Sequence, residues 1–306
     1  MTADWLFPAL RFAQYSVLLG LFGSLTFRLF GLRSLAATPL ATGPATLIAA
    51  VVAPLIVAAV MLVAIAEMMG QALWDLDWTT TASLVVTTDM GTAFLARTAL
   101  TGAAAVSLML VRPVRRSHTI AAWLYALALM TLAWNGHAAA TEGLAGLVHR
   151  INNCLHLTAA GLWIGAIMRF TAEIIDAHRR HDPVMDDALL SEMHSFRPFG
   201  LLLVGIVAFT GIINAQMIFG LEKLDLILRT PYGWMLGAKI VMVALMLGCA
   251  AYHANKIRQQ LAGNRDTRLD QRPLISAIRL SLVTEMLLAL GVISLAAVIG
   301  LSSPFD

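Results

Sequence analysis

Charged residues are scarce in this 306-residue sequence, at 13% against the ~25% found in average soluble domains. Apolar residues make up 59% of the chain, and the mean hydropathy is +0.78. The sequence also lacks a disulfide framework, because its two cysteines, Cys154 and Cys249, both fall inside apolar segments. These shortages exclude a soluble globular domain and a small secreted scaffold, and they predict a polytopic membrane protein.

Several sequence signatures are also missing. The chain contains no phosphate-binding loop, no HExxH pair and no nucleophile elbow, so ATP hydrolysis and other enzymatic activity are not expected. It has no internal repeat and no linker long enough to separate a soluble domain. Its basic residues lie in short loops, where they determine topology, so nucleic acid is not an expected partner.

Apolar windows of about 20 residues are long enough to cross a ~30 Å hydrocarbon core as helices. Backbone polar groups in lipid must be satisfied within the segment, which favours helices over strands. We therefore predict an all-α bundle of about eight transmembrane helices in the lipid bilayer, forming one integral membrane unit. The predicted segments are 6–30, 46–69, 91–111, 119–136, 149–176, 198–220, 231–255 and 275–301.

Basic residues alternate between the loops. The loops after the first, third, fifth and seventh segments hold Arg33, Arg112, Arg115, Arg116, Arg179, Arg180, Arg197, Lys256, Arg258, Arg265, Arg268 and Arg272. The termini and remaining loops hold only Lys223 and Arg229. The positive-inside rule then predicts that both termini are outside. Trp5, Trp74, Trp78, Trp134 and Trp234 fall near the predicted outer ends, where an interfacial belt is expected.

The fifth segment has two different faces. Helical spacing places His149, Asn152, Asn153, His156 and Trp163 on one side. Cys154, Thr158, Gly161 and Gly165 occupy the other, and the two glycines form a GxxxG pair that permits close approach of a neighbouring helix. We expect the first face to carry the chemistry and the second to pack.

Three histidines, His137, His149 and His156, lie at or near the predicted outer side. Imidazole groups suit late first-row metals such as copper. The alternative is that these histidines have no metal-binding role and lie at the membrane interface or, hydrogen-bonded, in the core. His149 and His156 are two turns apart, roughly 10 Å along the helix, whereas metal–nitrogen bonds are ~2 Å. One ion therefore cannot bind both in an unbroken helix. This favours an entry site at His137 and His149 with a deeper site at His156, or binding by a subset.

Other polar residues fall within the apolar segments, where they are costly and mark candidate functional positions. Lys239 and Glu285 lie near the predicted midplane and are expected to pair, as are Glu67 and Arg97 nearer the outer side. Gln14, Arg97, Asn214 and Lys239 fall at about the depth of His156, which predicts a polar layer. Met68, Met69 and Met217 are candidate thioether ligands for Cu(I), or ordinary packing residues.

Five blocks give the C-terminal part a resemblance to the CopD/PcoD family of bacterial copper-resistance inner-membrane proteins. They are GHA at 136–138, HRINNCLHLTAAGLWIG at 149–165, TGIINA at 210–215, RTPYGWMLGAK at 229–239 and LVTEMLLALG at 282–291. We accordingly divide the chain into a looser N-terminal part, 1–134, and a CopD-like part, 135–306. LRFAQYSVLLGLFG at 10–23 is similar to the family's first helix, but Gln14 stands where a histidine is common, and an amide is a poor copper ligand.

The resemblance implies copper handling at the cytoplasmic membrane beside a periplasmic copper-binding protein of the CopC type. The resulting hypothesis is that copper enters at His137 and His149, passes to His156 and moves inward through the bundle. Two alternatives stay open. One is a haem-binding redox protein, which usually needs facing axial histidines. The other is a membrane docking partner that binds a periplasmic copper chaperone without transporting copper.

Overall fold

The computed structural model describes residues 5–30, 42–135, 143–180, 183–262 and 272–305. This part of the chain is helical and contains eight helices that are long and apolar enough to cross a membrane. The prediction of a multi-pass all-α membrane protein is therefore confirmed. The eight spans are α1 (Leu6–Phe30), α2 (Pro44–Met69), α4 (Asp89–Leu110), α5 (Val114–Met130) with η2 (Thr131–Trp134), α6 (Gly143–Arg180), α7 (Pro183–Phe219), α9 (Pro231–Ala262) and α10 (Arg272–Ile299).

Two spans exceed the predicted segments by ten residues or more. Helices α6 and α7 have 38 and 37 residues, about 55 Å each at ~1.5 Å per residue, so both extend well beyond a ~30 Å hydrocarbon core. The prediction that Pro198 begins the sixth segment is wrong, because Pro198 lies inside α7, which starts at Pro183. Residues Leu189, Leu190 and Met193 pack with Ile174 on α6 in one buried cluster. Burial of this apolar face stabilises the helix N-terminal to Pro198.

Short elements that the sequence analysis did not predict connect the spans. They are η1 (Leu73–Asp75), α3 (Trp78–Thr87), η4 (Leu221–Lys223) and α8 (Leu224–Ile227). Asp77 caps α3, because its carboxylate accepts hydrogen bonds from the backbone N–H groups of Thr79 and Thr80 at 3.2 and 3.1 Å. Hydrogen bonds from the Thr80 side chain and from these two N–H groups hold the pKa of Asp77 below its usual value.

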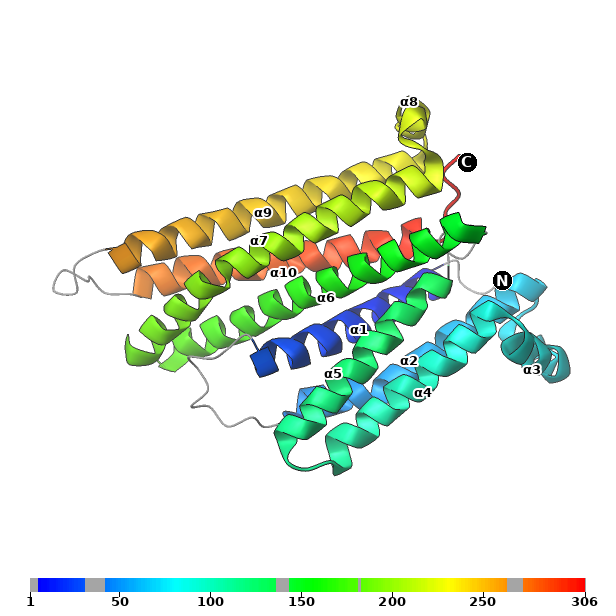
Figure 1. Cartoon of the computed structure of the whole chain (residues 1–306), viewed down its shortest axis with the longest axis horizontal. Coiled ribbons are helices and arrows are strands. Elements are labelled where there is room, and N and C mark those ends of the chain that lie inside the picture. The colour runs from blue at the N-terminus through cyan, green and yellow to red at the C-terminus, as the bar shows by residue number, and fades with distance from the viewer. Residues whose placement is uncertain (1–4, 31–41, 136–142, 181–182, 263–271, 306) are drawn as a thin grey trace.

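Helix α1 is the central element of the bundle. It contacts α2, α5, α6 and α10, whereas α2, α4 and α5 pack together on one side of it and α7 and α9 lie on the other (Figure 1). Both ends of the described chain lie at the same end of the bundle, since Gly300 after α10 is next to the Arg11 side chain in α1. We call this the terminal end.

Helices α1 and α6 touch through their backbones. A Cβ atom added to Gly23 would overlap the carbonyl oxygen of Gly161 and the Cα of Gly165. One added to Gly165 would overlap the backbone of Gly23 in turn. The predicted GxxxG packing surface is therefore confirmed, and its partner is the first helix of the chain.

Helices α7 and α9 lie at the edge of the bundle. Only 11% of the apolar window of α7 and 6% of that of α9 are buried inside the protein, against 44% for α6. Helix α9 begins as predicted: Thr230 precedes Pro231, and its hydroxyl accepts a hydrogen bond from the Gly233 N–H at 3.2 Å. These two helices present most of their surface to lipid and depend on few neighbours.

The glycine contact yields a stability prediction. Gly23→Ala should destabilise the purified protein by about 1–3 kcal/mol, because the new methyl group must force α1 and α6 apart. Gly102→Ala in α4 and Gly205→Ala in α7 are matched controls, since a Cβ at either position meets no atom within 4 Å. Thermal unfolding in detergent should show a lower Tm for Gly23→Ala alone. Equal Tm values for the three variants would contradict the close packing.

Candidate functional site

The predicted polar face of α6 lies largely inside the bundle. His149 is 2% exposed and Asn152 is 5% exposed, and Trp163 is also buried. His156 and Asn153 are half-buried. His137, the third predicted ligand, lies outside the described residues. The site can therefore be built only from α6 and the helices beside it.

Asn152 joins α6 to α7. Its amide nitrogen donates to the backbone carbonyl of Thr210 at 2.9 Å and to the Oδ1 atom of Asn214 at 2.8 Å. The amide therefore satisfies two acceptors on a single face of α7. Hydrogen bonds of this kind are favoured in lipid because water is absent as a competing partner.

His156 contacts the same residue of α7. Its Nδ1 atom lies 2.9 Å from the Thr210 hydroxyl oxygen. That hydroxyl donates its one hydrogen to the Ile206 carbonyl at 2.6 Å, so its oxygen is left to accept from Nδ1–H. The neutral imidazole then keeps its lone pair on Nε2. A fixed tautomer with a free Nε2 atom is the usual preparation of a histidine for metal binding.

A positive charge and an apolar layer border His156. The Lys239 ammonium on α9 is close enough to act electrostatically on the imidazole. Two turns further along α6, Trp163 packs with Leu203 of α7, Met246 of α9 and Ala289 of α10 in a buried cluster. Polar groups therefore occupy the level of His156, and the bundle is closed by apolar side chains below it.

The predicted thioether candidates do not gather at this site. Met68 is 60% exposed near the end of α2, and Met69 packs in a cluster with Ile65 and Leu73. Helix α2 makes its main helix contacts with α1 and α4. Met217 is half-buried on α7, three residues beyond Asn214, and is the only one of the three on a helix of the site.

The two predicted ion pairs are replaced by other contacts. Arg97 is fully buried and donates to the Thr131 hydroxyl at 2.8 Å, to the Thr131 carbonyl at 2.9 Å and to Asn135 Oδ1 at 2.5 Å, whereas Glu67 is exposed. Glu285 is 2% exposed, and its carboxylate lies 4.0 Å from His253 Nδ1 rather than beside Lys239. In both cases the contacting group is not the predicted opposite charge. Arg97 contacts neutral oxygens, and Glu285 lies beside a histidine.

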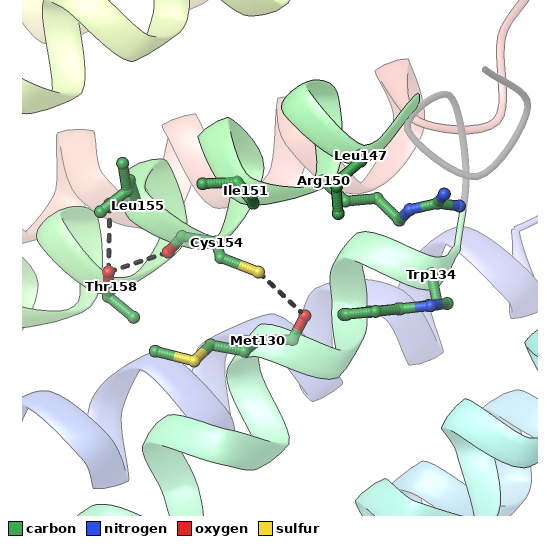
Figure 2. Close-up of a pocket in the computed structure, with 8 residues that line it drawn as sticks. All are labelled: Met130, Trp134, Leu147, Arg150, Ile151, Cys154, Leu155 and Thr158. Atoms are coloured by element: carbon green, nitrogen blue, oxygen red, sulfur yellow. Dashed lines mark hydrogen bonds between the residues drawn. The ribbon is translucent and has the colours of Figure 1, made fainter. Parts of the chain in front are cut away.

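A groove opens on the other face of α6, between that helix and α5 with η2 (Figure 2). It has a volume of about 170 Å³ and is lined mainly by apolar groups, including Leu147, Ile151 and Leu155. The Cys154 thiol donates to the Met130 carbonyl at 3.5 Å, and the Thr158 hydroxyl donates to the Cys154 carbonyl at 2.8 Å. The groove faces away from His156, so it is not part of the candidate site.

No three His, Cys, Asp or Glu side chains of the described ranges lie close enough to hold one metal ion together. The arrangement instead offers one interior imidazole, one oriented amide network and a hydroxyl that connects them. Such a site can bind a soft or borderline cation briefly, with few ligands from the chain.

Thr210 is the residue that sequence reasoning missed. It lies four residues before Asn214, so the two share a face of α7, and this spacing could have identified it. Its role depends on the α6–α7 register, which no local pattern reports. Arg11, which lies in the second turn of α1, was also overlooked because a single charge near the end of an apolar segment is common.

The fold and the site together define a multi-pass helical membrane protein with a buried imidazole and amide cluster. Residues 1–147 match the family described as copper resistance protein D-like, N-terminal domain, and residues 191–299 match copper resistance protein D. Copper resistance protein D of Pseudomonas syringae pv. tomato is 31% identical over 98% of this chain and 97% of its own length. The chain therefore belongs to the copper resistance protein D family.

Two further relatives match parts of the chain. Copper transport protein CutJ of Bacillus subtilis (strain 168) is 30% identical over 43% of this chain and 23% of its own length. Inner membrane protein YebZ of Escherichia coli (strain K12) is 28% identical over 38% of each chain. No solved structure matches.

The amide network gives a second prediction. Asn152→Leu should lower the stability of the purified protein by about 1–3 kcal/mol, because it removes both hydrogen bonds from α6 to α7 and leaves the Asn214 Oδ1 atom without this donor. Asn153→Leu is the matched control, since no described residue is hydrogen-bonded to the Asn153 side chain. Thermal unfolding would be measured for both variants. A larger loss of Tm for Asn153→Leu would show that the α6–α7 connection lies elsewhere.

Proposed function

We propose that this protein takes up copper from the periplasmic side of the bacterial inner membrane and moves it toward the cytoplasm. Family membership supports copper as the cargo. The observation that carries the site assignment is the contact between His156 and Thr210, which leaves Nε2 of a half-buried imidazole available for a soft metal ion. His137 and His149 form the entry site, and His156 is the next position inward.

The environment of His156 favours transfer over storage. Lys239 places a positive charge near the imidazole, which raises the cost of holding a cation there. A weak site suits a transport path, because an ion must leave as readily as it enters. Asn152 and Asn214 hold the surrounding helices in place and are positioning residues rather than ligands.

The path beyond His156 crosses the apolar cluster of Trp163 and Met246. Copper therefore advances only when helices around this layer separate. Helices α7 and α9 contribute to the cluster and have the least buried surface, so we assign the movement to them. On these two helices, Met246 belongs to the apolar cluster and Met217 is half-buried on α7.

The orientation of the chain is part of the proposal. The terminal end carries exposed tryptophans, Trp5, Trp74, Trp78 and Trp234, as expected at a membrane interface. The predicted inner end carries most of the basic residues. We place the terminal end in the periplasm, where a copper-binding protein of the CopC type could deliver the ion to the histidines.

The orientation predicts that alkaline phosphatase fused after Asp306 is active in cells, because that enzyme needs the oxidising periplasm. Green fluorescent protein fused at the same position should remain dark when exported by the same route. A fusion within 263–271 supplies the control, with the opposite expectation. A bright fluorescent C-terminal fusion would reverse the assigned orientation and with it the direction of entry.

Copper handling is tested with purified protein in proteoliposomes. Vesicles containing the protein should accumulate radioactive copper supplied with ascorbate. Replacement of His137, His149 and His156 by alanine should weaken copper binding at least about tenfold, which corresponds to ~1.4 kcal/mol, and should also reduce accumulation. His194→Ala is the matched control, because His194 is an exposed histidine near the opposite end of the bundle.

Each other outcome excludes part of the proposal. Unchanged copper binding by the triple variant would refute the ligand assignment. Copper binding without accumulation in vesicles would leave a docking protein for a periplasmic chaperone. A Soret band in the purified protein would identify a haem-binding redox protein instead.

A further inference from the structure

Arg97 is a fully buried cation in the half of the bundle that does not contain the proposed copper site. It is 0% exposed, and its guanidinium carbon lies 4.8 Å from the centre of the Phe94 ring. Its hydrogen bonds go to two oxygens of Thr131 and one of Asn135, which are all neutral. No carboxylate of the described residues pairs with it. Burial of an unpaired charge is among the costliest arrangements in a folded protein.

A second cation lies beside it on α1. Arg11 donates to the Tyr15 hydroxyl at 3.1 Å, and both side chains act electrostatically on Arg97. Phe7 and Leu10, in the same turns of α1, pack in one cluster with Phe94 of α4. Two guanidinium groups therefore lie near the cluster in which side chains of α1, α2 and α4 meet, and their mutual repulsion adds to the cost of burial.

Unused hydrogen-bond donors occur on the elements that meet here. Arg11 Nε and Gln14 Nε2 of α1, Arg97 Nη1 of α4 and Asn135 Nδ2 after η2 are buried and have no hydrogen-bond partner among the described residues. Arg11, Gln14 and Tyr15 share one face of α1 through their i, i+3 and i+4 spacing. The orientation of the Asn135 amide is fixed, because arginine only donates and Asn135 Oδ1 accepts from it. Its Nδ2 must therefore be a donor.

The four unpaired atoms are all hydrogen-bond donors. Two belong to positively charged arginines and two to amides, and the hydroxyl and carbonyl oxygens of Thr131 already accept from Arg97. Buried polar groups in native proteins are almost always satisfied, so an external acceptor is needed here, and the two positive charges favour an anion over water. The Arg97 side chain is wholly enclosed, which excludes a bulky lipid headgroup and favours a compact ion.

We propose that Arg11, Gln14, Arg97 and Asn135 form a binding site for a small monovalent inorganic anion of the size of chloride. The ion accepts hydrogen bonds from the four donors and neutralises part of the buried positive charge. It thereby links side chains of α1 to those of α4 and η2. None of the four residues lies on the helix of His156, but Asn135 is two residues before His137 of the proposed entry site.

The proposal is tested by binding of radioactive chloride to the purified full-length protein, in gluconate buffer at constant ionic strength. The wild type should show one saturable site per chain, and bromide should displace chloride while phosphate should not. Arg97→Gln should weaken binding by about tenfold or more, since hydrogen bonds to charged groups are worth ~1.5–3 kcal/mol. Arg229→Gln is the matched control, because Arg229 is an exposed arginine at the terminal end.

A second readout covers the case in which Arg97→Gln does not fold. Gln14→Leu removes an amide whose nitrogen has no partner among the residues that the structure describes, so it should leave folding intact. The Tm of the wild type should rise when chloride replaces gluconate, as expected for a ligand that binds the folded state, and this rise should be smaller in Gln14→Leu. A wild type without saturable chloride binding, or an equal rise in both proteins, would overturn the proposal. Displacement by phosphate as readily as by bromide would also overturn it.

Discussion

Every polar group buried in a hydrocarbon environment needs a partner from within the protein, because water is absent. This constraint explains why α6 and α7 meet through a network rather than through apolar packing alone. Asn152 gives its amide hydrogens to Thr210 and Asn214, and the Thr210 hydroxyl completes the network at His156. Hydrogen-bond donors and acceptors are nearly equal in number there. His156 is held in one tautomer by the Thr210 hydroxyl, which is itself fixed by its hydrogen bond to the Ile206 carbonyl.

The N-terminal half meets the same constraint with a different result. Arg97 uses the oxygens of Thr131 and Asn135, yet donors remain in excess and the two cations have no described carboxylate partner. A network with surplus acceptors would attract a cation, and one with surplus donors attracts an anion. The two halves of the bundle thus differ in the partner that their polar groups can bind. The imidazole of His156 can accept a cation, and the donors around Arg97 can hold an anion.

Length, hydropathy and charge alternation were sufficient to locate all eight spans, because lipid imposes a minimum length on every helix. The face containing His149, Asn152 and His156 was also predictable, since helical periodicity is local. Contacts between helices were not. Thr210 as the partner of His156, and His253 as the neighbour of Glu285, depend on the register of packed helices.

Pro198 illustrates the same limit for helix boundaries. A proline after an arginine is a sound signal for a helix start, but burial of Leu189, Leu190 and Met193 against α6 extends the helix past it. Tertiary packing outweighs the local preference when enough apolar surface is covered. Asp77 is the converse case, because its capping of α3 is a local pattern that the sequence does display.

Backbone contact between Gly23, Gly161 and Gly165 leaves no side chain between α1 and α6 that could change rotamer and let the helices slide. Helices α1 and α6 therefore act as a fixed frame for the whole molecule. His149 and His156 belong to this frame, whereas Thr210 and Lys239 belong to helices that bury little of their surface. In the proposed transport cycle the two histidines would stay still while the groups around them move, so copper would be controlled by changing the surroundings of a stationary ion.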